Sequence, residues 1–107
     1  MSDFAVRVIM GALKPGSRAA TEAYRKLYLN TEHWRKFRIE AHTHYKGICS
    51  ECGGYVTLNQ ANVHHIRYFD AHGSILFREK YGDVRVVHQG ECHRRADRKR
   101  KKALRRS

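Results

Sequence analysis

The sequence predicts a single small domain of the α+β class, and three observations support this. The chain has 107 residues, which is enough for one domain and leaves little for a second. Apolar residues recur at helical spacing in the first half, where Trp34 and Phe37 are expected core residues. Residues 63–68 and 83–87 are each interpreted as a short strand, and Cys92 begins a further helix. Helices that flank a pair of strands are the pattern of an α+β domain.

The N-terminal part is expected to hold one irregular segment and two helices. Residues 4–13 are apolar and are interpreted as a short strand or an irregular arm. Ser17 then follows a turn and is a suitable N-cap for a helix that runs to about residue 29. Asn30 or Thr31 is expected to cap the next helix.

Charge narrows the class of binding partner. The chain carries 22 Lys and Arg against 10 Asp and Glu, a net charge of +12, with a pI near 10.1. A field of this sign favours polyanions, with nucleic acid first and an acidic membrane surface second. No run approaches the roughly 20 apolar residues that a membrane span needs, and no secretory signal is recognisable. We therefore expect a cytoplasmic protein without a membrane partner.

The positive charge is concentrated at the C-terminus. Residues 94–107 contain nine basic residues and one acid, Asp97. Too few apolar residues follow Asp97 for packing, so residues 99–107 are expected to be a frayed helix end or an arm that becomes ordered on a phosphate backbone. A solubilising tail, or an address that a receptor reads, is the alternative.

The cysteine pattern favours a metal site. Cys49 and Cys52 form a Cys-x2-Cys pair followed by Gly53, which is typical of a zinc knuckle but also of a redox pair. His88 and Cys92 supply a second pair, so that three thiolates and one imidazole complete a tetrahedral set. This set accounts for the odd number of cysteines. Unrelated buried cysteines and a surface histidine are the alternative.

A second group of polar residues lies between and after the zinc pairs. His64 and His65 are adjacent in the first expected strand and therefore point to opposite faces. His93 and Asp97 are four residues apart on the last helix and share one face. A strand pair followed by this helix would bring His64, His93 and Asp97 to one point. Two imidazoles and a carboxylate suit a divalent ion with open positions for phosphate and water.

Taken in order, these residues resemble the HNH endonuclease family, in its small phage and bacterial type with a structural zinc knuckle. The resemblance covers residues 28–98 and includes the helix that carries Trp34. It implies the ββα-metal fold, an HNH nuclease domain over residues 28–98, an N-terminal arm and helix over residues 1–27, and a basic tail over residues 99–107.

The resemblance also implies roles for the second group of residues. His64 and His93 would bind a catalytic metal, either Mg2+ or another divalent ion, and Asp97 matches a further position of that site. His65 matches the general base, which removes a proton from water. Asp83 matches the residue that secures the loop carrying the base. The cysteine set, with His88, would hold a structural Zn2+.

The implied function is metal-dependent hydrolysis of DNA phosphodiester bonds, by nicking or by double-strand cleavage, in a bacterial or phage-infected cell. DNA is the expected partner, and a larger DNA-processing complex is a second one. The basic residues expected to contact nucleic acid are Arg67, Arg85, Arg94, Arg95, Arg98, Lys99, Arg100, Lys101 and Lys102. The alternatives are a non-catalytic, zinc-stabilised nucleic-acid-binding module and an RNA-binding zinc protein of the ribosome. Neither alternative explains why His64, His65, His93 and Asp97 should converge.

Overall fold

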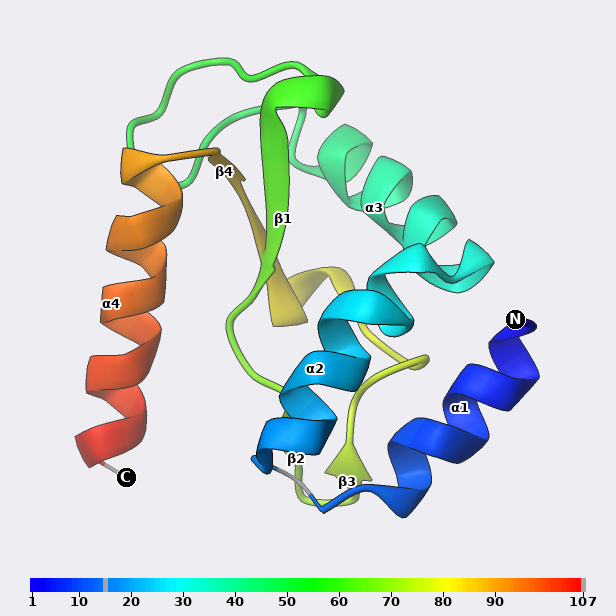
Figure 1. Cartoon of the computed structure of the whole chain (residues 1–107). Helices are drawn as coiled ribbons and strands as arrows, with labels where there is room; N and C mark the ends of the chain where they lie inside the picture. The colour runs from blue at the N-terminus through cyan, green and yellow to red at the C-terminus, as the bar shows by residue number, and fades with distance from the viewer. Residues whose placement is uncertain (15, 107) are drawn as a thin grey trace. The chain divides into compact units, whose positions relative to one another are not determined.

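The computed structural model describes residues 1–14 and 16–106, with the backbone alone for residues 104–106. Helices and short antiparallel strands are both present, so the fold is of the α+β class, as predicted (Figure 1). The chain divides into two compact units, residues 1–38 and residues from 39 onward. This division falls inside α3 (Glu32–His44).

The expectation of a strand or an irregular arm over residues 4–13 is wrong, because this segment forms helix α1 (Asp3–Ala12). Ser2 is its N-cap, and the Ser2 hydroxyl oxygen accepts a hydrogen bond from the backbone N–H of Ala5 at 3.2 Å. Val6 is buried and Met10, one turn later, is half-buried, which is the spacing of a helix face. The cap and this spacing therefore outweigh the β-branched content of the segment.

The two capping predictions that follow are confirmed. The Ser17 hydroxyl accepts the backbone N–H of Ala20 at 3.1 Å and starts α2 (Arg18–Lys26). This helix ends three residues before the expected position 29, and a short 3-10 turn, η1 (Tyr28–Asn30), takes the place of its last turn. Thr31 then caps α3, since its hydroxyl accepts the backbone N–H of Trp34 at 3.1 Å.

Aromatic side chains form the core of the first unit. Tyr28 is completely buried, and Trp34 and Phe37 are buried beside it. The ring centroids of Tyr28 and Trp34 lie 5.8 Å apart, and those of Trp34 and Phe37 lie 6.0 Å apart, both in tilted arrangements. Trp34 and Phe37 are therefore core residues, as the sequence predicted.

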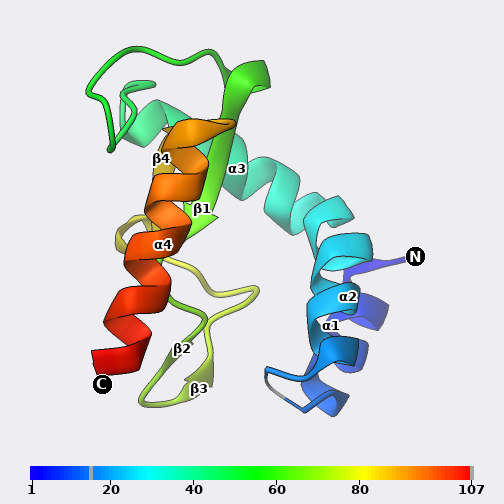
Figure 2. The same cartoon turned by 60° about the vertical axis from the view of Figure 1, so that its left-hand side comes forward.

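The second unit is built on two paired strands and the last helix. β1 (Ala61–His65) pairs antiparallel with β4 (Val84–His88), with Val63 opposite Val86. α4 (Glu91–Arg106) contacts both strands, and it runs alongside them in Figure 1 and Figure 2. The valines of both strands are buried and form the centre of the apolar core of this unit, to which Val56 and Ile75 also contribute.

The chain between β1 and β4 is a long connection with little regular structure. It contains a small antiparallel hairpin, β2 (Phe69–Asp70) with β3 (Gly73–Ser74), and a 3-10 turn, η3 (Tyr81–Asp83). β1 ends at His65, so the predicted strand was too long at its C-terminal end. Another 3-10 turn, η2 (Leu58–Gln60), precedes β1.

The basic C-terminus continues the last helix. α4 extends through residues 99–106, so the described part of the predicted tail is helical, and Ser107 lies outside the described residues. Within the described residues, no helix combines the length and the apolar character that crossing a bilayer requires.

The cap at Thr31 gives a stability prediction. Its hydroxyl accepts the N–H of Trp34 and donates to the carbonyl oxygen of Tyr28 at 2.7 Å, in a buried setting. Thr31→Ala should therefore lower the free energy of unfolding by about 1–2 kcal/mol. Urea denaturation followed by the fluorescence of the single tryptophan would measure this. Thr31→Ser keeps the hydroxyl and should retain most of the stability. Equal losses in both variants would show that methyl packing, not capping, stabilises the segment.

Candidate functional site

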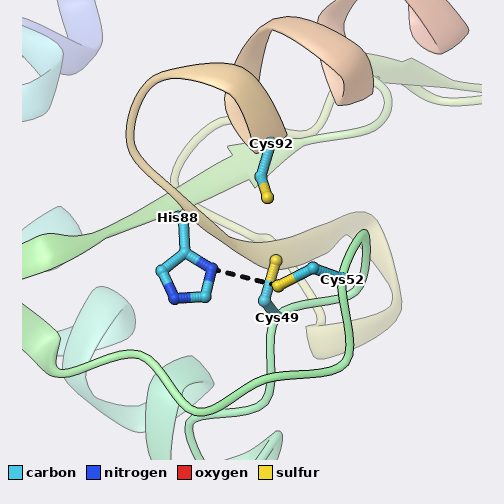
Figure 3. Close-up of side chains that lie close together, drawn as sticks. All are labelled: Cys49, Cys52, His88 and Cys92. Carbon is cyan, nitrogen blue, oxygen red and sulfur yellow. Dashed lines mark hydrogen bonds between the residues drawn. The ribbon is translucent and has the colours of Figure 1, made fainter.

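Three cysteines and one histidine from separate elements converge on one point. Cys49 and Cys52 lie in the turn after α3, His88 is the last residue of β4, and Cys92 lies in the first turn of α4. Their ligand atoms all lie within 4.8 Å of one another, and Figure 3 shows the four side chains directed toward a common space. Among the described residues, this group forms a candidate metal site of the Cys3His type, as the spacing predicted.

Backbone hydrogen bonds fix the turn that carries the first two thiols. The N–H of Gly53 donates to the carbonyl oxygen of Cys49 at 2.9 Å, and the N–H of Cys49 donates to that of Gly54 at 2.9 Å. Gly53 has a φ of 76°, a left-handed conformation that favours glycine. The N–H of Ser50 donates to the carbonyl oxygen of Val86 at 2.9 Å, so the turn is joined directly to β4.

The orientation of His88 suits a metal ligand. Its Nδ1 lies 3.3 Å from the sulfur of Cys52 (Figure 3), and its Nε2 lies 3.2 Å from the carbonyl oxygen of Tyr55. A carbonyl oxygen can only accept, so Nε2 carries the proton and Nδ1 keeps its lone pair for the metal side. A backbone carbonyl in this position commonly orients a histidine ligand.

The thiols differ in their readiness to ionise. Burial tends to raise the pKa of Cys49, but backbone hydrogen bonds, beginning with that from Cys52, lower it to about 6. Burial, together with the neighbouring thiols Cys49 and Cys52, raises the pKa of Cys92 to about 11. Three adjacent thiolates repel one another, so full ionisation of the set requires a cation between them. This is the electrostatic pattern expected of a structural metal site.

A second cluster of ionisable groups lies where β1 meets the N-terminal half of α4, and it consists of His64, His93 and Asp97. His64 is buried on β1, and its ring centroid lies 5.3 Å from that of His93 on α4. The Nε2 of His64 is 3.7 Å from Oδ1 of Asp97, which is longer than a hydrogen bond. Among the described residues, neither ring nitrogen of His64 has a hydrogen-bond partner. The structure therefore brings together the three residues that the sequence placed at one point, although less closely than the Cys3His group.

His64 is held in its neutral form. Burial, and then the positive charges of Arg100 and His93, lower its pKa to about 4, while Asp97 opposes the shift. A neutral imidazole keeps one nitrogen lone pair at physiological pH. Burial of an imidazole whose two nitrogens both lack partners is unfavourable, so the site has unused capacity for a ligand.

Asp97 has partners other than the histidines. Burial tends to raise its pKa, but the hydrogen bond from Lys101 and the charge of Arg100 lower it overall, so the carboxyl group is ionised. Nη2 of Arg100 lies 2.5 Å from Oδ1, and Nζ of Lys101 lies 3.1 Å from Oδ2. Both carboxylate oxygens are thus in contact with cations of the same helix.

His65 points to the opposite face of β1, as alternation along a strand predicted. Its Nε2 lies 2.8 Å from Oε2 of Glu79, and neither side chain has any exposed surface. The ring also stacks on Tyr68, with centroids 5.2 Å apart. Glu79 was not among the site residues predicted from the sequence, because it lies between Arg78 and Lys80 in the segment that connects the two expected strands, where no periodicity marks it as buried.

Asp83 does not contact His65 through its side chain. Its Oδ2 accepts the backbone N–H of Lys80 at 2.9 Å, and its Oδ1 pairs with Nε of Arg67 at 2.7 Å. Its carbonyl oxygen accepts the N–H of Ile66 at 2.9 Å. Asp83 therefore anchors the residue that follows His65 through the backbone, while Glu79 makes the side-chain contact.

The basic residues expected to bind nucleic acid divide into two groups. In the first group, each side chain contacts another group of the protein: Arg67 with Asp83, Arg85 with Tyr45, Arg94 and Arg98 with Glu91, Lys99 with Glu51, Arg100 with Tyr68 and Asp97, and Lys101 with Asp97. Most of these keep exposed surface, whereas the side chain of Arg100 is only 16% exposed and points inward. In the second group are Arg95 and Lys102, which are exposed and have no acidic partner among the described residues.

Comparisons of the chain with protein-family models, curated proteins and solved structures found no match.

The Cys3His group predicts a tightly bound metal. Protein purified without added metal should contain about one metal ion per chain, measured by elemental analysis. Cys52→Ser and His88→Ala should each lose most of this metal and the cooperative unfolding of the second unit, because four ligands are needed to close the site. His72→Ala removes an exposed histidine from the β2–β3 turn and is the matched control. Full metal content in His88→Ala would exclude His88 as a ligand.

Proposed function

We propose that this chain is a metal-dependent endonuclease of the HNH type that hydrolyses DNA phosphodiester bonds. The observation that carries the proposal is the buried His64, which lies beside His93 and Asp97 and whose two ring nitrogens lack partners in the part of the chain that the structure describes. A non-catalytic binding module has no use for an unsatisfied buried imidazole at this position. The order of strand, strand and helix around these residues supports the ββα-metal fold that the resemblance implies.

We assign His64, His93 and Asp97 as the residues that would hold a catalytic divalent ion. Two imidazoles suit a borderline cation, and the ionised carboxylate also admits a harder one such as Mg2+. When bound, such an ion would neutralise charge that develops on the scissile phosphate and on the leaving oxygen. His64 requires no deprotonation for this role at neutral pH, since its pKa is lowered to about 4 by burial and by neighbouring positive charge.

His65 is proposed as the general base. Its contact with the carboxylate of Glu79 favours the tautomer with the proton on Nε2. In the proposed mechanism Nδ1 receives the proton of the attacking water. His65 has no exposed side-chain surface, and Tyr68 covers one face of its ring. Catalysis therefore requires the segment that carries Tyr68 to move and admit water.

DNA is proposed as the substrate because the chain is strongly basic and because basic residues lie on the helix that carries His93 and Asp97. The net charge is +12, and α4, which supplies His93 and Asp97, also carries the exposed Arg95 and Lys102. A helix that extends from the reacting centre into a basic surface is suited to follow a phosphate backbone.

Zinc is proposed as the ion of the Cys3His group. Three thiolates and one imidazole in a closed set are typical of structural zinc, which prefers sulfur and nitrogen ligands in a tetrahedral arrangement. Lys99 adds a further tie, since its Nζ lies 2.9 Å from Oε1 of the nearly buried Glu51 in the cysteine turn. Zinc would thus hold the turn, β4 and α4 together around the proposed reacting centre.

Cleavage of supercoiled plasmid tests the proposal. The wild-type protein should nick or cut the plasmid with Mg2+ present, and EDTA should abolish cleavage. His65→Ala should reduce the rate at least ~10²-fold, the scale of a lost general base, while DNA affinity is retained. His64→Ala and His93→Ala should raise the Mg2+ concentration needed for cleavage, since each would remove one ligand.

The control for contaminating nuclease is His72→Ala, carried through the same purification. Its cleavage should equal that of the wild type, because His72 is exposed and outside both clusters. Salt-dependent DNA binding without cleavage in any divalent metal would instead favour the non-catalytic, zinc-stabilised binding module. Undiminished cleavage by His65→Ala would contradict the assignment of the base.

The salt dependence of DNA binding tests the role of α4. Arg95 and Lys102 have no acidic partner among the described residues, so each is available to a phosphate. Each phosphate contact adds about −0.9 to the slope of log K against log salt, so Arg95→Gln with Lys102→Gln should flatten the slope by about two. The matched control, Arg25→Gln with Lys26→Gln in α2, removes the same charge from exposed sites. Equal flattening in both double variants would indicate a general charge effect and not a defined surface of α4.

A further inference from the structure

We propose that Glu79 is the positioning residue of His65, fixing its tautomer and the direction of its ring. The inference deepens the proposed nuclease function and depends on it. Oε2 of Glu79 lies 2.8 Å from Nε2 of His65, and both side chains are without exposed surface. Asp83, the residue that the sequence suggested for securing the base, makes no side-chain contact with it.

The chemistry of the contact determines where the proton of the neutral imidazole lies. An ionised carboxylate can only accept hydrogen bonds, so Nε2 is the donor and the neutral ring is held in the Nε2–H tautomer. In a fully buried contact this preference is strong, because the effective dielectric is low and an unpaired carboxylate would be costly. A carboxylate that holds an imidazole in one tautomer is the arrangement found in catalytic triads.

Glu79 is itself held on both sides along the chain. On the N-terminal side, the guanidinium of Arg78 bonds to both oxygens of Asp70, at 2.7 and 2.9 Å, and to the carbonyl oxygen of Ser74 at 2.8 Å. On the C-terminal side, the N–H of Lys80 bonds to Asp83. Anchors at both neighbours restrict the backbone of Glu79, so its carboxylate is presented to His65 by a fixed segment.

The ring of His65 is also fixed on its face. Tyr68 stacks on it with an interplanar angle of 27°, and the Tyr68 hydroxyl accepts a hydrogen bond from Arg100 at 2.6 Å. Arg100 in turn contacts Asp97, a proposed ligand of the catalytic ion. Glu79 therefore fixes the ring at its edge, while Tyr68 and Arg100 fix its plane relative to the helix that carries Asp97.

A purely structural ion pair would make a different prediction from a positioning residue. If Glu79 only stabilised the fold, Glu79→Gln would lower stability and leave the protons of His65 and the cleavage rate of the folded protein unchanged. If it positions His65, Gln can donate its amide N–H to Nε2, which shifts the imidazole proton to Nδ1 and blocks proton acceptance there. The tautomer and the rate would then change together.

The experiment uses the full-length, metal-loaded protein and compares Glu79→Gln, Glu79→Asp and the control Glu22→Gln, an exposed acid in α2. Nitrogen-15 NMR of His65 in the absence of DNA reports the tautomer, and single-turnover cleavage at saturating protein reports the rate. Glu79→Gln should shift His65 away from the Nε2–H form and slow cleavage at least ~10²-fold, with unchanged DNA affinity. Glu79→Asp keeps the acceptor and should restore the wild-type tautomer with part of the rate. Glu22→Gln should match the wild type.

The outcomes separate this inference from the nuclease proposal. Wild-type cleavage by folded Glu79→Gln overturns the role of Glu79 while leaving the nuclease function intact. A wild-type protein that does not cut DNA with any divalent metal overturns both, even where NMR finds the Nε2–H tautomer. If Glu79→Gln fails to fold, Glu79→Asp provides the test. The inference is overturned if NMR finds that His65 has lost the Nε2–H form in this variant while the variant cleaves at the wild-type rate.

Discussion

The antiparallel ladder between β1 and β4 is the constraint on which both clusters depend. Its register places His64 opposite Arg85 and His65 opposite Val84, so the two imidazoles leave opposite faces of one short strand. The same ladder carries β4 to His88, which is paired with Ala61 and reaches the cysteine turn. A slip of one residue would exchange the faces of all these side chains at once. The buried valines of the two strands oppose such a slip.

α4 connects the two clusters through neighbouring residues. Cys92 and His93 are adjacent in its first turns, and successive residues on a helix differ in direction by about 100°, so one side chain joins the cysteine group and the next joins His64. The orientation of α4 about its own axis therefore sets both sites. Metal in the Cys3His group would fix that rotation, which gives the structural ion a direct influence on the proposed reacting centre.

The sequence predicted those features that depend on local spacing, and it missed those that depend on contacts between distant segments. Cysteine spacing, the Ser17 and Thr31 caps and the alternation of the two histidines are local, and the structure has each of them. Residues 4–13 were interpreted as a strand or an irregular arm from their apolar character alone, whereas the Ser2 cap and tertiary packing decide for a helix. Glu79 was missed because an acidic residue is buried only where a partner accepts it, and its partner, His65, is distant in the sequence. The inward orientation of the Arg100 side chain was missed for a similar reason. Its neighbours in the basic segment are exposed, whereas Arg100 contacts Tyr68, which is distant in the sequence, and Asp97.

The charge of α4 has a consequence for the behaviour of the protein in acid. Three carboxylates, Glu51, Glu91 and Asp97, contact five cations of this helix, and the pKa values of Glu91 and Asp97 are lowered, Glu91 chiefly by its hydrogen bond from Arg98. A lowered folded-state pKa means that these contacts stabilise the fold at neutral pH and are lost as the pH falls through the folded-state values. Protonation would then leave a helix of like charges without internal counterions. Mutual repulsion would fray it from the C-terminal end toward Asp97, so acid should open the helix before it disrupts the apolar strand pair.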